Sequence, residues 1–280
     1  MGHPSQSALF NGLVSGGMML GAIAGDIIGS VHEFKCGKTM DFPLFVEHSN
    51  FTDDSVLTVA VAECLVTGAN YADKFREYAL AYPGRGYGGM FYEWAFRGNR
   101  MPYSSWGNGS AMRVSPVAFA FEDLESVVQE AGRSAAVTHN HPEGVRGARA
   151  TAAATFLARK GASKAEIRKV IESRFDYDLS RTVAEIRETY DFDESCQGTV
   201  PEAITAFLES EDYENAIRLA ISLGGDADTL ACITGGIAAA FYGGVPKHIA
   251  EPAWALLDDK LRSVVSVFCK NYSIPHIPEH

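Results

Sequence analysis

Two short acidic segments contain the residue types in this sequence that are best suited to chemistry. One is Thr52-Asp53-Asp54-Ser55, and the other is Asp226-Ala227-Asp228-Thr229, which follows a pair of glycines. Each segment precedes an apolar run with helical periodicity, so each is predicted at the beginning of a helix. At such a position a hydroxyl oxygen can accept hydrogen bonds from the first backbone N–H groups of the helix. Acidic side chains there are stabilised by the positive end of the helix dipole. The alternative interpretation is that the two segments together bind cations.

The acids occur without a nearby Lys or Arg in either segment. Carboxylates and hydroxyls without thiolates or a histidine pattern favour hard cations such as magnesium, manganese or calcium. Glu33 is a further candidate, because it lies seven residues after Asp26, at the end of the first predicted helix. Two divalent ions would neutralise four of the five charges in the candidate set, which otherwise would raise pKa values and destabilise the fold. The set comprises Glu33, Asp53, Asp54, Asp226 and Asp228. A two-metal site is therefore our hypothesis, with helix capping as the alternative.

A glycine-rich loop, Ser105-Trp106-Gly107-Asn108-Gly109, leads into an apolar segment. Glycine and asparagine tolerate positive φ angles, so backbone N–H groups here could point together and hold an anion. Trp106 could stack on a nucleobase, although an ordinary loop with a surface aromatic residue fits equally well. The loop is not a P-loop, because no Gly-Lys-Ser/Thr follows it.

Two histidines, His139 and His141, lie close together in the sequence. A zinc site is not favoured, because a third ligand at suitable spacing is missing. A hydrogen bond from one histidine to a phosphate or ribose and a contact at a helix C-terminus both remain open. The sequence contains no Gly-x-Ser-x-Gly motif and no convincing Cys–His pair.

Composition excludes several classes of protein. The chain has 280 residues, 24 Lys and Arg against 35 Asp and Glu, and a formal net charge of −11, which argues against binding to nucleic acid. With 46% apolar residues it can form a core. Its 5 cysteines are widely spaced, which favours a reducing cytoplasm over disulfides or structural zinc. The uncharged residues 4–25 are too rich in Gly and Ser for a membrane span.

The predicted elements are helices, and strand patterns are sparse. In the first predicted helix, residues 19–32, glycines at 21, 25 and 29 leave one face bare for a close neighbour. We interpret residues 1–17 as a disordered or vector-derived leader and residues 18–280 as one compact all-α domain. The uncharged run 229–246 is predicted to lie in the core. The other predicted helices are 52–67, 72–81, 89–97, 124–137, 143–159, 164–174, 183–189, 201–209, 213–222, 228–242 and 251–270.

Five segments in order resemble the ADP-ribosylglycohydrolase family, which includes the dinitrogenase reductase-activating glycohydrolase and the mammalian ADP-ribosyl-acceptor hydrolases. The segments are residues 21–34, 51–55, 107–113, 138–139 and 224–229. The resemblance implies an all-α, multi-helix orthogonal bundle with two Mg²⁺ or Mn²⁺ ions in a central cleft. It also implies that Glu33 contacts the metal site and acts in catalysis, with Asp54 as the second choice for the catalytic role.

The same resemblance implies the other residue roles. Metal coordination falls to Thr52, Asp53, Asp54, Asp226, Asp228 and Thr229, together with Glu33. Substrate binding falls to Gly86, Gly88, Ser105, Trp106, Gly107, Asn108, Gly109 and His139. The departure from the family pattern is Trp106, where tyrosine is more usual.

The function that the resemblance implies is metal-dependent hydrolysis. The bond would be the N- or O-glycosidic link between ADP-ribose and a protein side chain, or the link in a small ADP-ribose conjugate. A silent ADP-ribose-binding module and a crystallin-like structural protein are the alternatives, but both acidic motifs are complete. Serine and arginine linkages both remain open, with Glu33 and the loop at residues 105–108 favouring serine. We expect a cytoplasmic monomer that binds neither nucleic acid nor membranes.

Overall fold

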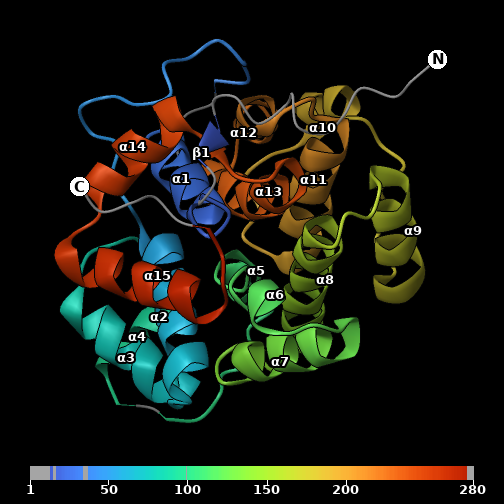
Figure 1. Cartoon of the computed structure of the whole chain (residues 1–280). Coiled ribbons are helices and arrows are strands. Elements are labelled where there is room, and N and C mark those ends of the chain that lie inside the picture. Colours follow the sequence, from blue (N-terminus) through green and yellow to red (C-terminus); the bar gives the residue numbers. More distant parts are fainter. Residues whose placement is uncertain (1–12, 15–16, 34–36, 99, 276–280) are drawn as a thin grey trace.

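Two helices, α1 (Leu20–Gly29) and α13 (Ala227–Tyr242), lie side by side at the centre of the protein (Figure 1). The computed structural model describes residues 13–14, 17–33, 37–98 and 100–275. All of α1 and nearly all of α13 are buried. The predictions of an all-α class and of a buried helix after residue 229 are therefore confirmed.

The glycines of α1 bring the two central backbones into contact. A Cβ atom at Gly25 would lie 2.1 Å from the carbonyl oxygen of Ala231, and one at Gly29 would lie 2.4 Å from the Cα atom of Asp228. No side chain fits into such gaps, so the predicted role of these glycines in close approach is confirmed. The contact places Asp26 of α1 beside the beginning of α13.

The other helices surround this pair. They are α2 (Asp53–Thr67), α3 (Tyr71–Ala81), α4 (Gly89–Phe96), α5 (Gly109–Met112), α6 (Val117–Ala120), α7 (Leu124–Ala136), α8 (Pro142–Arg159), α9 (Lys164–Phe175), α10 (Val183–Thr189), α11 (Cys196–Glu209), α12 (Tyr213–Ile221), α14 (Lys247–Leu256) and α15 (Asp259–Asn271). Helices α2, α3, α4 and α15 gather on one side of the molecule in Figure 1, and α7, α8 and α9 on the other. Helices α8, α11 and α12 pack against α13.

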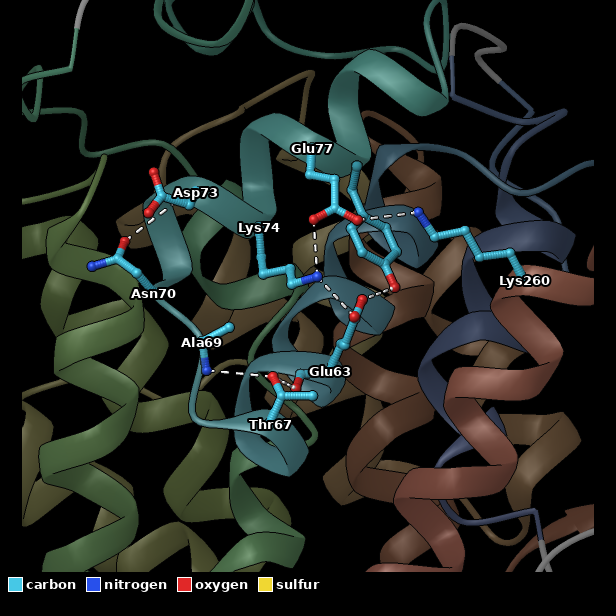
Figure 2. Close-up of polar contacts among 9 residues, drawn as sticks. Glu63, Thr67, Ala69, Asn70, Asp73, Lys74, Glu77 and Lys260 are labelled. Atoms are coloured by element: carbon cyan, nitrogen blue, oxygen red, sulfur yellow. Dashed lines mark hydrogen bonds and ion pairs between the residues drawn. The ribbon is translucent and has the colours of Figure 1, made fainter.

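Polar side chains connect α2 to α3, and α3 in turn to α15 (Figure 2). Glu63 of α2 accepts hydrogen bonds from Lys74 Nζ at 2.8 Å and from the Tyr78 hydroxyl at 2.5 Å. Lys74 also binds Glu77 at 2.9 Å, and Lys260 of α15 reaches the same Glu77 at 3.4 Å. Because these contacts hold the second half of α2, they also hold the direction in which its N-terminus points.

One predicted helix is wrong in the structure. The segment 251–270 contains the end of α14 and most of α15, with a break at Leu257 and Asp258. Leu257 is extended, and the Asp258 carboxylate accepts a hydrogen bond from the backbone N–H of Leu261 at 2.9 Å. The apolar periodicity continues across this N-cap, which is why the pattern concealed the break.

Two other boundaries differ by more than one residue, and two short helices were not predicted. The first predicted helix ends at Gly29 rather than at residue 32, and Glu33 lies in the turn that follows. Helix α11 begins at Cys196, and Pro201, which was taken as its beginning, lies inside it. The short helices α5 and α6 were not predicted, since four residues are too few for a periodic pattern.

A small antiparallel pair joins β1 (Leu13–Val14) to β2 (Val245–Pro246). Strand β1 precedes residue 18, where the folded domain was predicted to begin. The rest of the predicted leader up to residue 16 lies outside the described residues, so that interpretation stays a prediction. Among the helices of the described ranges, none has the length and apolarity needed to cross a membrane. The cysteines at 64, 196, 232 and 269 are buried and unpaired.

Candidate metal centre and ligand cavity

The N-terminus of α2 forms around Asp26, a carboxylate on α1. Asp26 accepts hydrogen bonds from the backbone and hydroxyl of Thr52 at 3.0 and 2.6 Å, from the backbone N–H of Ser55 at 3.1 Å, and from the Ser55 hydroxyl. Thr52 is also the N-cap, because its hydroxyl oxygen accepts from the backbone N–H of Asp54 at 3.3 Å. The capping interpretation of Thr52 is therefore confirmed, and Asp54 remains free for another role.

The N-terminus of α13 is arranged differently, because the N-cap residue Asp226 makes no side-chain capping bond. Its carboxylate instead accepts a hydrogen bond from Asn108 Nδ2 at 2.7 Å. The same amide group donates to Thr199 Oγ1 at 3.0 Å. Asp228 accepts from the backbone N–H of Thr229 at 3.0 Å. Asn108 therefore orients one of the acids from across the cavity.

Two groups of three carboxylates meet at these helix ends. One comprises Asp26, Asp54 and Asp228, and the other comprises Glu33, Asp226 and Asp228; within each, the ligand oxygens lie within 4.8 Å of one another. Asp228 belongs to both groups. The Oδ1 atom of Asp54 is buried and has no hydrogen-bond partner. An all-oxygen donor set with an unpartnered buried carboxylate oxygen fits a hard divalent cation.

The protein alone does not neutralise this cluster. Burial, followed by the charges of neighbouring acids, raises the pKa values of Asp54 and Asp228 well above the usual range. Burial is also the largest cause that raises the pKa of Asp26. Glu33 is half-buried, and burial together with the charges of Asp226, Glu194 and Asp26 raises its pKa to about 7. No ion pair of a described Lys or Arg reaches either carboxylate group.

Asp53 lies beside the cluster but belongs to neither group. Its backbone N–H donates to the carbonyl oxygen of Arg85 at 2.8 Å, and a Cβ atom at Gly86 would lie 3.1 Å from Asp53 Oδ1. The carboxylate of Asp53 therefore faces the glycine-rich loop that begins at Gly84. Burial and the charge of Asp26 nevertheless raise its pKa well above the usual range.

A cavity of about 570 Å³ opens above the carboxylates. Its lining contains every residue predicted to bind substrate: Gly86, Gly88, Ser105, Trp106, Gly107, Asn108, Gly109 and His139. It also contains all the predicted metal ligands except Thr52, the residue that precedes Asp53 in the sequence. Trp106 is 50% exposed at the wall of the cavity, with one edge on the ring of His141. The structure thus brings together segments that are far apart in the sequence.

The loop at residues 105–109 does not adopt the backbone conformation that its glycines allowed. None of Gly107, Asn108 and Gly109 has a positive φ angle, and Asn108 has a φ of −70°. The loop is held instead by the segment before α11, through Asn108 N–H to the Glu194 carbonyl at 2.7 Å and Cys196 N–H to the Trp106 carbonyl at 2.9 Å. The predicted cradle of positive-φ residues is therefore wrong, although the loop lines the cavity as expected.

The two histidines have separate environments. His139 is buried at the end of α7, where its backbone N–H continues the helix and its ring lines the cavity. His141 is the N-cap of α8, because its Nδ1 atom accepts from the backbone N–H of Glu143 at 3.2 Å. Neither belongs to a metal-binding group of the described residues.

Sequence reasoning missed four residues of this site. Asp26 could have been found, because it is the one charge within a glycine-striped apolar helix, and a buried carboxylate needs partners. Nothing in the sequence around Glu194 indicates a site. An isolated bridge between Gly107 and Ser195 holds its segment against the loop at residues 105–109, which places Glu194 in the lining of the cavity. Tyr103 and Arg113 also line the cavity; Arg113 ends one of the segments that carry the family resemblance, but no site role was predicted for either residue.

Comparisons with known proteins agree with this geometry. The family described as ADP-ribosylglycohydrolase matches residues 15–271. The chain is 26% identical to ADP-ribosylhydrolase ARH3 of Gallus gallus (85% of this chain, 87% of that protein) and 27% identical to the Homo sapiens ARH3 (81% and 85%). It is 28% identical to ADP-ribosylarginine hydrolase Tri1 of Pseudomonas putida (88% and 76%).

A solved structure titled "ADP-ribosylglycohydrolase-related protein complex" has the same fold, with a TM-score of 0.68 and 24% identity over 91% of this chain and 96% of that chain. The family match covers α1, α2 and α13, whose ends form the carboxylate cluster, and nearly all of the described fold. The chain therefore belongs to the ADP-ribosylglycohydrolase family.

Proposed function

We propose that this protein hydrolyses the glycosidic bond that joins ADP-ribose to a protein side chain or to a small conjugate. One observation carries the proposal: two carboxylate groups that share Asp228 form the floor of a cavity walled by the loop at residues 105–109 and by His139. A cavity of about 570 Å³ is suited to a small-molecule ligand. Family membership and the names of the relatives support the same reaction.

The cofactor in this proposal is a pair of Mg²⁺ or Mn²⁺ ions. Asp26, Asp54 and Asp228 would hold one ion, and Glu33, Asp226 and Asp228 would hold the other. The hydroxyls of Thr52 and Thr229 would add oxygen ligands beside these acids. When bound, such ions orient sugar hydroxyls and a water molecule and supply positive charge.

Glu33 is our candidate for moving the proton. It is half-buried on the cavity wall, and burial with its acidic neighbours brings its pKa to about 7, which suits a group that takes a proton from water and returns one to a leaving group. Asp54 is the second choice. Cleavage of a glycosidic bond develops positive charge at the anomeric carbon, which these carboxylates would stabilise.

We propose a serine-linked O-glycoside as the preferred substrate, on the resemblance of Glu33 and the loop at residues 105–108 to the serine-specific branch. An arginine-linked N-glycoside is the second candidate. It is favoured by Glu194 and Asp193, which add negative charge to the cavity wall where a guanidinium leaving group would be attracted. The burial of unpaired cysteines supports a reducing cytoplasm, and a monomer remains our expectation.

The test is to offer serine- and arginine-ADP-ribosylated peptides in parallel, with and without Mg²⁺ or Mn²⁺. Release of ADP-ribose only with the ion is expected, and Asp226→Ala, which removes a ligand from one of the two proposed sites, should abolish turnover and reduce the stabilisation by the ions. Binding of ADP-ribose without release from either peptide would assign the protein to the silent binding class. Full activity of Asp226→Ala in chelator-treated buffer would overturn the two-ion site.

A further inference from the structure

Three side chains form a chain of contacts behind the cavity wall. Arg113, which follows α5, is completely buried and donates from Nη2 to the Thr138 hydroxyl oxygen at 2.7 Å. That hydroxyl lies 2.7 Å from Nδ1 of His139. His139 turns its other ring nitrogen toward the loop: Cβ atoms at Gly107 and Gly109 would lie 3.5 and 3.2 Å from His139 Nε2.

We infer that Arg113 and Thr138 are positioning residues that set the tautomer of His139, so that its Nε2–H group faces the cavity as a hydrogen-bond donor. The partner is an acceptor oxygen of the ligand, in ADP-ribose a diphosphate or ribose oxygen. The identity of that ligand rests on the proposed function, whereas the tautomer is a property of the ligand-free protein.

The direction of the hydrogen bonds follows from the donors. A guanidinium group has no acceptor, so the contact between Arg113 and Thr138 uses a lone pair of the Thr138 oxygen. Of the contacts that the structure describes for this hydroxyl, the one with Nδ1 of His139 is short, at 2.7 Å, and we assign its hydrogen to that nitrogen rather than to the Tyr103 hydroxyl, with which Thr138 also interacts. A ring nitrogen that accepts is unprotonated, and in a neutral imidazole the proton is then on Nε2.

Burial, assisted by the charge of Arg113, favours the neutral form of the His139 imidazole. Arg113 takes part in none of the ion pairs between described residues, and its Nε and Nη1 atoms are buried without partners. Its guanidinium lies 4.3 Å from the centre of the Phe75 ring. Burial, and then the charge of Arg113, lowers the pKa of His139 well below the usual range. A neutral imidazole has one donor nitrogen and one acceptor nitrogen. The direction of the hydrogen bond between Thr138 and Nδ1 therefore decides which of the two faces the cavity.

The opposite tautomer would have a different consequence. A His139 ring with its proton on Nδ1 would point a lone pair into the cavity, and a lone pair repels the oxygens of a phosphate. The contacts of Arg113 with Thr138 and of Thr138 with His139 therefore determine whether His139 presents a hydrogen-bond donor or an acceptor to the cavity. They do so without placing a formal charge on His139. Such a donor suits a cavity in which the carboxylates already attract the cations.

A purely structural role for Arg113 is the competing explanation. The guanidinium connects α5 to α7 through Thr138 and the Ser134 carbonyl, and it packs on Phe75 of α3. Removing it would then lower stability without changing the state of His139. The two explanations differ in what they expect of the imidazole nitrogens and of a substitution at Thr138.

The experiment is nitrogen NMR of ¹⁵N-histidine-labelled protein, with His139 assigned by the signal that disappears in His139→Gln. The wild-type protein should show a protonated Nε2 and an unprotonated Nδ1. Thr138→Val removes the hydroxyl at nearly constant shape and should shift His139 toward a mixture of tautomers. Thr138→Ser restores the hydroxyl and should restore the signal. Thr155→Val, which removes a buried hydroxyl that bonds to Thr151 within α8, is the matched control.

The same variants separate binding from turnover. Because only the tautomer with a proton on Nε2 donates to the ligand, Thr138→Val should weaken ADP-ribose binding in proportion to the fraction of His139 that leaves this tautomer, about 2-fold for an even mixture, raising KM more than it lowers kcat. Thr138→Ser and Thr155→Val should bind nearly as the wild type does. A protonated Nδ1 in the wild type, or an unchanged tautomer and affinity in Thr138→Val, would overturn the inference. Since the NMR needs no substrate, these outcomes remain readable if hydrolysis is absent.

Discussion

Asp228 is the residue on which the proposed cation site depends most. It is the member common to the group with Asp26 and Asp54 and the group with Glu33 and Asp226. Its backbone also contacts α1 at Gly29, where no side chain intervenes. A shared carboxylate couples two sites, because its loss removes a ligand from both.

Substitution at Asp228 should therefore differ from substitution at its neighbours. We expect Asp228→Asn to weaken cation binding at both sites by about 10-fold or more, since each loses a charged ligand. Asp54→Asn and Asp226→Asn should each weaken one site. Isothermal titration calorimetry with Mn²⁺ reports the number and affinity of the ions.

The control for this series is Glu194→Gln, which removes a cavity carboxylate outside both groups. It should keep the number of bound ions. If Asp228→Asn binds the same number of ions with the same affinity as the wild type, the shared-ligand arrangement is wrong.

The residue types and their spacing were enough to predict most of the cluster. Paired acids at two helix beginnings, without basic neighbours, indicated Asp54, Asp226 and Asp228. The pattern could not show that Asp53 turns toward Gly86, because the direction of a side chain depends on the loop that reaches it. Asp26 was not predicted as a member of the cluster because it lies within a helix rather than at its beginning.

At the scale of elements, the glycine stripe of α1 is the feature that determines the geometry of the site. It lets α1 approach α13 until backbone atoms touch. This contact places the C-terminal half of α1, with Asp26, beside the N-terminus of α13, with Asp228. Helix α2 completes the site through its N-terminus, and its other half is held by the contacts of Glu63 with α3 (Figure 2).

Adding one methyl group to this contact should be destabilising. We expect Gly25→Ala to lower the free energy of unfolding by about 2 kcal/mol or more, because the new Cβ would lie 2.1 Å from the Ala231 carbonyl oxygen and the helices must move apart. Urea denaturation of the cation-free protein measures the change. Gly89→Ala is the control: a Cβ there meets no atom within 4 Å, so no loss is expected. Equal stability of the two variants would contradict the close contact.

Helical periodicity predicted the long helices well, but it failed at boundaries that are set by a capping side chain. Helix α2 was predicted within one residue, because Thr52 and the following acids form a clear beginning. The break at Asp258 was missed because the apolar period does not change there. Pro201 was taken as the beginning of a helix, but the Ser195 side chain caps α11 by accepting from the backbone N–H of Gly198.

At the scale of the whole molecule, the formal net charge of −11 has an uneven distribution. Part of it is buried in the carboxylate cluster, where the protein supplies no ion-pair partner from the residues that the structure describes. Two divalent ions would neutralise most of this buried charge. The stability of the whole fold should therefore depend on the ions and on pH together.

The stabilisation by Mg²⁺ or Mn²⁺ should increase as pH rises. Burial and acidic neighbours raise the pKa of Glu33 from 4.5 to about 7 in the cation-free fold, and they raise the pKa values of Asp54 and Asp228 well above the usual range. Protonation in the folded state therefore stabilises the cation-free protein at acid pH, and this stability is lost as pH rises through 7. Bound ions replace the protons, so their effect is largest where the protons are absent.

Thermal unfolding with saturating Mg²⁺ and with chelator, at pH 5.5 and at pH 8, tests this linkage. At an ion concentration of 100 times Kd, one site contributes about 2.7 kcal/mol. We expect a larger difference in Tm between the two conditions at pH 8. A difference in Tm that is independent of pH, or larger at pH 5.5, would show that the ions do not bind at these carboxylates.

The contact between α1 and α13 also has a consequence for ion selectivity. Because backbone atoms rather than flexible side chains separate Gly29 from Asp228, the cage has little freedom to expand around a larger ion. Magnesium binds oxygen at about 2.0–2.1 Å and calcium at about 2.3–2.6 Å with more ligands. If the proposed ions bind here, a cage of fixed span would discriminate between magnesium and calcium by ionic radius, and the bare glycine face of α1 would be the element that selects the metal.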